Sequence, residues 1–166
     1  MNGYAVISLL GLIAVTQSAI LARVSLHGWY PNLMLLSVIA WSLQRGPREG
    51  MLWGFAGGVA LDLLSGAPLG LNIILLTLCG YLAGLGEWRI FRTNFILPIV
   101  FVIVMTVGYY IMQVLILQFT GIPLPWLDTI VWVLLPSLAL NLVFSPVVFR
   151  PLRWLSHHTG REQLRW

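Results

Sequence analysis

The sequence predicts an all-α membrane protein: a bundle of six transmembrane helices that forms one integral membrane domain over residues 1–166. The first observation behind this prediction is composition, because 59% of the residues are hydrophobic and only 8% are charged. Soluble domains average about 45–50% apolar and about 25% charged residues, so a soluble fold is excluded. The second observation is length. One span takes about 20 apolar residues, so this chain has room for about six spans and no separate globular domain.

Six apolar runs, separated by polar residues, glycine or proline, define the expected helices. They cover residues 4–22, 30–43, 50–64, 69–86, 95–118 and 128–149, and residues 150–166 follow as a cytoplasmic tail. The first run has no basic segment before it, which favours a retained span over a cleaved signal peptide. The second run covers only about 21 Å at 1.5 Å per residue. It therefore needs either an extension toward Trp29 or a locally thin bilayer.

The basic residues are all arginine, and their distribution predicts the orientation in the membrane. If all six runs cross, one side carries Arg45, Arg48, Arg89, Arg92, Arg150, Arg153, Arg161 and Arg165, and only Arg23 lies on the other. Cytoplasmic loops of membrane proteins carry the excess of basic residues, so both termini are expected in the cytoplasm and the chain in the cytoplasmic (inner) membrane. No basic stripe runs along a helix, which argues against nucleic acid, and the basic tail is expected to contact anionic membrane lipids.

Glycine recurs at every fourth residue in the third apolar run, at Gly50, Gly54 and Gly58, and Asp62 continues the same spacing. Residues four apart share one face of a helix, and glycine on that face lets a neighbouring backbone approach closely. Gly57 widens the flat surface. Two interpretations remain open: packing against another helix of the same chain, or docking of a partner protein's helix.

Asp62 lies inside a predicted span, near the outer end of the third run, whereas Asp128 is the first residue of the sixth run, at a helix start. A carboxylate at that depth is costly and is a functional candidate by default. One alternative is structural, because Asp62 can accept hydrogen bonds from Ser65 or from N–H groups of residues 66–70 and so fix the turn. A contact with a partner or a pore, and acid–base chemistry, are the other interpretations.

No residue pattern predicts a catalytic, cofactor-binding or metal site. Cys79 is the one cysteine, which excludes a disulfide within the chain and a site of cysteine ligands. No pair of histidines has helix-face metal spacing, and neither a phosphate-binding loop nor a dinucleotide motif occurs. Polar residues in the first, fifth and sixth runs either bond helices together or line a small-ligand pocket: Thr16, Gln17, Ser18, Gln113, Gln118, Ser137 and Asn141.

Three motifs between residues 28 and 86 carry a resemblance to a known family. The first is Tyr30-Pro31-Asn32-Leu33-Met34-Leu35-Leu36. The second is the glycine-spaced third run, together with Trp41 and the loop from Arg45, which both precede it in the sequence. The third is Leu61-Asp62-Leu63-Leu64-Ser65-Gly66-Ala67-Pro68-Leu69-Gly70. Together they resemble the MreD family of bacterial rod shape-determining membrane proteins. Asn32 departs from the family pattern, which usually has aspartate after the proline.

The resemblance implies a non-enzymatic component of the cell-elongation complex, with no cofactor, that helps control peptidoglycan synthesis and cell shape. Its main partner would be MreC, a single-span protein with a large extracytoplasmic domain, and RodA, a class B penicillin-binding transpeptidase and MreB would be further partners. The resemblance also implies a fold similar to the S components of ECF vitamin transporters. The residues expected to contact a partner or to hold the structure for it are Gly50, Gly54, Gly57, Gly58, Asp62, Pro68, Gly70 and Pro31.

Two functions follow as hypotheses. The first is an adaptor that binds the MreC transmembrane helix through the glycine face of the third run, a second and shorter small-residue face at Gly80 and Gly84 in the fourth run, and the region from Asp62 to Gly70. The second is a substrate-binding subunit of a small-molecule transporter, with a pocket lined by the polar residues of the first, fifth and sixth runs.

Overall fold

The computed structural model describes residues 3–24, 30–65, 68–86, 96–121 and 129–158. Over these ranges the regular structure is entirely helical, as the sequence predicts. The six helices are α1 (Gly3–Val24), α2 (Leu33–Arg45), α3 (Pro47–Leu64), α4 (Leu71–Gly84), α6 (Ile96–Phe119) and α8 (Leu135–His158), and a π-helical turn, η1 (Ile130–Leu134), precedes α8.

Two stretches are long and apolar enough to cross a membrane by length and composition, Pro98–Phe119 in α6 and Val131–Ser156 in η1 and α8. The apolar stretches Ser8–Ala19, Leu33–Arg45 and Leu71–Gly84 are shorter. Helix α2, with 13 residues, covers about 20 Å, so its shortness is confirmed. Six complete crossings remain a prediction.

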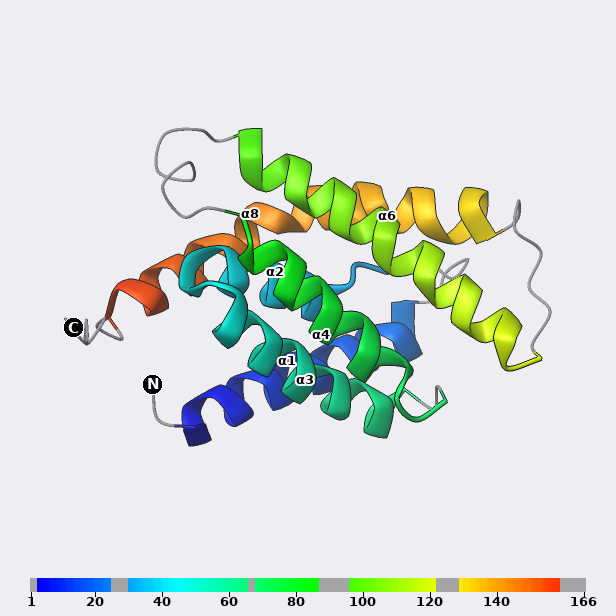
Figure 1. Cartoon of the computed structure of the whole chain (residues 1–166), viewed down its shortest axis with the longest axis horizontal. Helices are drawn as coiled ribbons and strands as arrows, with labels where there is room; N and C mark the ends of the chain where they lie inside the picture. The colour runs from blue at the N-terminus through cyan, green and yellow to red at the C-terminus, as the bar shows by residue number, and fades with distance from the viewer. Residues whose placement is uncertain (1–2, 25–29, 66–67, 87–95, 122–128, 159–166) are drawn as a thin grey trace.

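The helices alternate in direction between two ends of the bundle (Figure 1). At one end, which we name the inner end after the predicted orientation, α1 begins, α2 is joined to α3, and α8 finishes. At the opposite end, the outer end, α3 finishes and α4 begins. Helix α2 lies at the centre, because it contacts α1, α3, α4, α6 and α8 and every residue from Met34 to Gln44 is buried.

Helix ends differ from the expected ones for local reasons. Helix α3 starts at Pro47, three residues before the glycine pattern, because proline suits the first turn of a helix. Gly46 alone separates α2 from α3 and has φ of +91°, a conformation that favours glycine. Helix α8 continues through Pro146 and Pro151 to His158, so the segment after residue 149 begins as a helix.

Candidate functional site

The glycine face of α3 packs directly on the backbone of α4. A Cβ atom built on Gly54 would lie 2.2 Å from the carbonyl oxygen of Leu76, and one on Gly58 would lie 2.4 Å from Cα of Ile73. Gly50 of α3 meets Gly80 of α4, where a Cβ on Gly80 would lie 2.2 Å from the Gly50 oxygen. Real Cβ atoms essentially never come closer than 3.0 Å to another heavy atom. Helix α4 therefore covers this face, which is not open to a partner helix in this structure.

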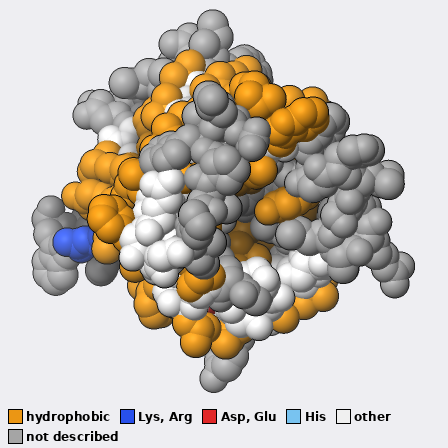
Figure 2. All heavy atoms as spheres, turned by 90° about the vertical axis from the view of Figure 1, so that its right-hand side faces the viewer, with side chains coloured by type: hydrophobic (Ala, Val, Ile, Leu, Met, Phe, Trp, Pro, Cys, Tyr) orange, Lys and Arg blue, Asp and Glu red, His pale blue; other side chains and the backbone are white. Residues whose placement is uncertain are grey.

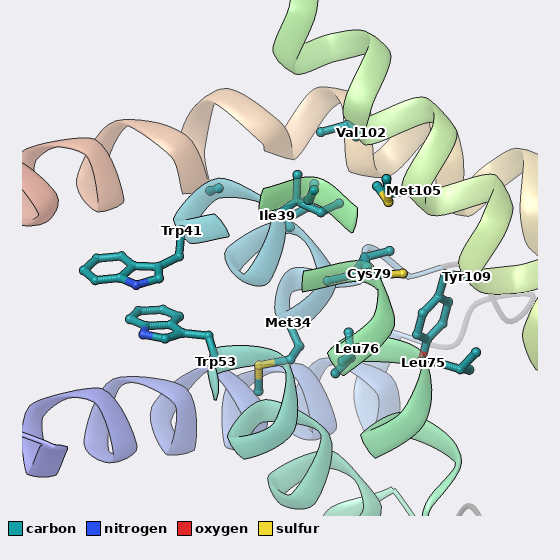
Figure 3. Close-up of a cluster of buried hydrophobic side chains, with 14 of the residues drawn as sticks. Met34, Ile39, Trp41, Trp53, Leu75, Leu76, Cys79, Val102, Met105 and Tyr109 are labelled. Carbon is teal, nitrogen blue, oxygen red and sulfur yellow. The ribbon is translucent and has the colours of Figure 1, made fainter. Parts of the chain in front are cut away.

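Gly57 points to a different neighbour. A Cβ on Gly57 would lie 2.7 Å from the sulfur of Met34 in the central helix α2, and Figure 3 shows the Met34 side chain extending from α2 toward α3. The glycine-rich helix thus packs closely on two helices of its own chain. Small residues give this close approach in membrane bundles, where the lipid supplies no hydrophobic driving force for helix association.

Asp62 is buried, with 4% of its surface exposed, and its carboxylate caps the start of α4. Its Oδ2 accepts hydrogen bonds from the N–H groups of Gly70, at 2.8 Å, and Ile73, at 3.3 Å. Its Oδ1 accepts from the N–H and the side-chain amide of Asn72, at 3.0 and 2.9 Å. The first N–H groups of a helix have no partner within the helix, and the dipole there favours negative charge. The carboxylate thus joins the end of α3 to the start of α4.

The turn between these helices depends on Gly70. This residue has φ of +97° and carries no capping side chain, so the carboxylate of Asp62 supplies the cap from another helix. The N–H of Leu71 donates to the carbonyl oxygen of Pro68 at 3.2 Å and closes the turn. Pro68 and Gly70 therefore hold the turn that presents the cap, while residues 66–67 lie outside the described residues.

A second polar cluster fixes the start of α2. Pro31 is buried immediately before it, and the Asn32 carboxamide oxygen accepts from the Leu35 N–H at 3.0 Å as the helix cap. Gln17 of α1 accepts from the Met34 N–H at 2.8 Å. The Asn32 N–H donates to the side chain of Asn141 in α8 at 2.8 Å. This central helix is thus anchored by side chains from both ends of the sequence.

The sequence indicates an interhelical role for Asn141 but not for its partner Thr106. The amide of Asn141 donates to the Thr106 hydroxyl of α6 at 3.1 Å. Asn141 stands out as a polar residue within an apolar run, and its interhelical role is one of the two roles considered for it. Thr106 is missed, because a single threonine in an apolar helix usually bonds its own backbone.

At the inner end, the indole rings of Trp41 and Trp53 stack with centroids 4.2 Å apart and an interplanar angle of 12° (Figure 3). The Trp41 Nε1 donates to the carboxylate of Glu49 at 3.0 Å, and the Arg45 guanidinium carbon lies 5.2 Å from the centroid of the Trp41 ring. Arg45 also donates to the carbonyl oxygen of Ser156 at 3.0 Å. These contacts tie α2 and α3 to the last turns of α8.

A cavity of about 400 Å³ lies at the outer end of the bundle. It is lined by Gln17, Ser18, Tyr30, Asn32, Leu61, Leu64, Ser65, Asn72, Tyr109, Tyr110 and Gln113. Three of the polar residues predicted for a pocket, Gln17, Ser18 and Gln113, are in this set. The others come from the end of α3, from the starts of α2 and α4 and from neighbouring tyrosines of α6, which no pattern in the sequence brings together.

The described polar residues form hydrogen bonds that hold the helices together or line the cavity. In the ranges that the structure describes, no group of three or more histidine, cysteine, aspartate or glutamate residues could hold a metal ion. Cys79 is buried and unpaired. Asp128, at the start of the sixth apolar run, lies outside the described residues.

The family comparison covers nearly the whole chain. The model of the family described as "MreD: rod shape-determining protein MreD" matches residues 1–155, well beyond the motifs of residues 28–86. No solved structure matches the chain. Members of this family are non-enzymatic shape-determining membrane proteins. The glycine-packed α3–α4 pair and the buried Asp62 cap are features of this chain. By its family match, the chain belongs to the MreD family and acts in rod-shape determination.

Proposed function

We propose that this chain is the membrane adaptor of the cell-elongation complex and that it binds MreC within the cytoplasmic membrane. The observation that carries the proposal is the family match over residues 1–155. RodA, the class B penicillin-binding transpeptidase and MreB are the further partners proposed for it. Because these partners carry the enzymatic and filament functions, the adaptor influences peptidoglycan synthesis indirectly.

The proposed contact lies beside the Asp62 cap. Since α4 covers the glycine face of α3, the surface left for a partner in this region is the set of exposed leucines around the turn, here called the outer ledge: Leu63, Leu64 and Leu69. Their exposed fractions are 72%, 47% and 79%. With both termini in the cytoplasm, the outer ledge lies at the extracytoplasmic membrane surface. A single-span partner leaves the membrane at that level on the way to its extracytoplasmic domain.

Co-purification tests this proposal. The affinity-tagged chain is co-expressed with the host's MreC, extracted in mild detergent and analysed by size-exclusion chromatography. We expect the two proteins to co-elute, and we expect the double substitution Leu63→Ala and Leu69→Ala to reduce MreC recovery about tenfold, since buried apolar anchors dominate binding energy.

The matched control is Phe119→Ala, because Phe119 is 89% exposed at the end of α6 but outside the outer ledge. Its co-elution should equal that of the wild type. Elution of the wild-type chain without MreC would overturn the adaptor function, whereas normal co-elution of the double variant would overturn only the outer ledge as the contact.

The cavity favours a second candidate function, a substrate-binding subunit similar to the S components of ECF transporters. Such a subunit would need a cytoplasmic ATPase module and would import its ligand. Depletion of the chain would then reduce uptake of a small molecule, whereas the adaptor function predicts loss of rod shape with normal uptake.

A further inference from the structure

Among the residues that the structure describes, those that line the cavity at the outer end carry no charge. Its described lining residues are asparagine, glutamine, serine, tyrosine and leucine, with no acidic or basic side chain. Figure 2 looks onto this end of the molecule, where hydrophobic and uncharged groups make up most of the described surface. A buried ion needs a compensating partner, so this cavity is suited to a neutral ligand.

Part of the lining is held rigid by contacts inside the chain. Asn72 donates to Asp62 and accepts a hydrogen bond from the Tyr109 hydroxyl. Gln17 and Asn32 are bonded to each other at 3.4 Å and to the first turn of α2. Polar groups that are already fixed give a binding site its orientation without an ordering cost at the moment of binding.

Other lining groups are available to a ligand. Within the part of the chain that the structure describes, the side chains of Ser18, Tyr30 and Gln113 make no hydrogen bond. Hydroxyl and amide groups both donate and accept hydrogen bonds. Leu61 and Leu64 line the same cavity, and so do the aromatic residues Tyr109 and Tyr110. The complementary ligand therefore has a rim of donors and acceptors and at least one apolar face.

We propose that this cavity is a binding site for a neutral sugar of the pyranose class, including its N-acetylated form. A pyranose ring has hydroxyl groups that both donate and accept, and it has an apolar C–H face that packs on aromatic rings. A volume of about 400 Å³ lies within the range of about 300–1,000 Å³ typical of small-ligand sites. The sugar can reach the cavity free in solution or as the headgroup of a lipid, and both sources share this chemistry. The site goes beyond the adaptor function and does not depend on it.

Titration of the purified full-length chain tests the proposal. The protein is kept in an amine-oxide detergent, because sugar-based detergents would compete. The probes are N-acetylglucosamine, the same sugar on a neutral alkyl chain, and N-acetylglucosaminuronate, which differs from the first probe by one carboxylate. We expect the neutral sugars to bind saturably and the charged sugar to bind at least about tenfold more weakly, because the described lining offers its carboxylate no basic side chain.

A pair of variants locates the binding. Gln113→Leu removes a lining amide that has no hydrogen bond among the described residues, so we expect a normal fold and about tenfold weaker sugar binding. Thr16→Val is the control, because Thr16 is exposed on α1 and bonds to the Leu12 carbonyl of its own helix. It should bind sugar like the wild type.

Each outcome is decisive for the site. Much tighter binding of the alkyl sugar identifies a lipid-borne ligand, and equal binding of the two neutral probes identifies a free sugar. No saturable binding at millimolar concentration, equal binding of the charged sugar, or unchanged binding in folded Gln113→Leu would each overturn the proposal. None of these results would change the co-elution expected with MreC, so failure of the sugar site is distinguishable from failure of the adaptor function.

Discussion

At the scale of single residues, the most informative group is the carboxylate of Asp62. It accepts four hydrogen bonds, three of them from backbone N–H groups at the start of α4. Such a carboxylate is costly within a membrane unless its oxygens are satisfied. Because both oxygens are bonded here, the residue fixes the α3–α4 turn and with it the outer ledge.

We expect Asp62→Ala to lower the free energy of unfolding by about 2–3 kcal/mol, since it leaves buried N–H groups of α4 without an acceptor. Asp62→Asn keeps one acceptor oxygen and should lose less. Unfolding measured in detergent micelles, with both variants beside the wild type, checks this order. Equal stability of Asp62→Ala and the wild type would contradict the capping role.

The glycines of α3 make a second prediction at this scale. Gly54→Ala places a methyl group against the α4 backbone and should cost about 1–3 kcal/mol, the usual penalty of overpacking. Gly108→Ala in α6 is the matched control, because a Cβ there has nothing within 4 Å. It should be neutral or slightly stabilising in the same unfolding measurement. Equal effects of the two substitutions would show that the α3–α4 approach is looser than described.

At the scale of elements, α2 is the helix on which the bundle is assembled. It is short, and its start is held by the cluster of Gln17, Asn32 and Asn141. In a membrane, a short helix whose first N–H groups were exposed to lipid would be unstable, because lipid offers no hydrogen-bond partners. The cluster therefore lets α2 begin inside the bundle.

Asn141→Leu should destabilise this arrangement by about 1–3 kcal/mol, because the buried Asn32 N–H loses its acceptor. Ser145→Ala on the same helix is the control, since the Ser145 hydroxyl bonds only to the Leu142 carbonyl one turn earlier. Hydrogen exchange of the Asn32 amide is the direct readout. We expect exchange to accelerate in Asn141→Leu and to stay unchanged in Ser145→Ala.

Sequence reasoning predicts the elements better than their contacts, although the bond from the Gly70 N–H to Asp62 is one of the interpretations considered for that residue. Apolar runs and glycine or proline punctuation predict most helix ends to within a few residues, because these signals are local; the exception is the end of α8, which continues past the predicted residue 149 to His158. The burial of Trp41 and Trp53 is not local: the two side chains are 1% and 3% exposed and stack on each other across two helices. Their stacking depends on the single-residue connection at Gly46, which no periodicity predicts.

At the scale of the whole molecule, the arginines predict which end faces the cytoplasm. Arg48 lies at the inner end and Leu69 at the outer end, and both are exposed. In intact spheroplasts, a membrane-impermeant maleimide should label Leu69→Cys and should label Arg48→Cys only after lysis. The native Cys79 is buried, so background labelling should be low. Labelling with the opposite pattern would reverse the orientation.

For the molecule as a whole, the cavity can be predicted in part from the chain's own residues, whereas the proposed partner comes from the family. The polar residues of α1 and α6 predict a pocket in part, but the cavity also needs Tyr30 and Asn72, which only the folded arrangement of α2 and α4 brings near them. Composition and spacing do not predict binding of MreC. The proposal of this partner rests on family membership and on the exposed leucines beside the Asp62 cap.

Photo-crosslinking in growing cells tests the central claim, partner binding at the outer ledge, most directly. A photoreactive amino acid is placed at Leu69, and in a parallel strain at Phe119, which is equally apolar and exposed at the end of α6. We predict an ultraviolet-dependent adduct that contains MreC from position 69 and little or none from position 119. Adduct from position 119 but not from position 69, or no MreC adduct from either, would contradict the account.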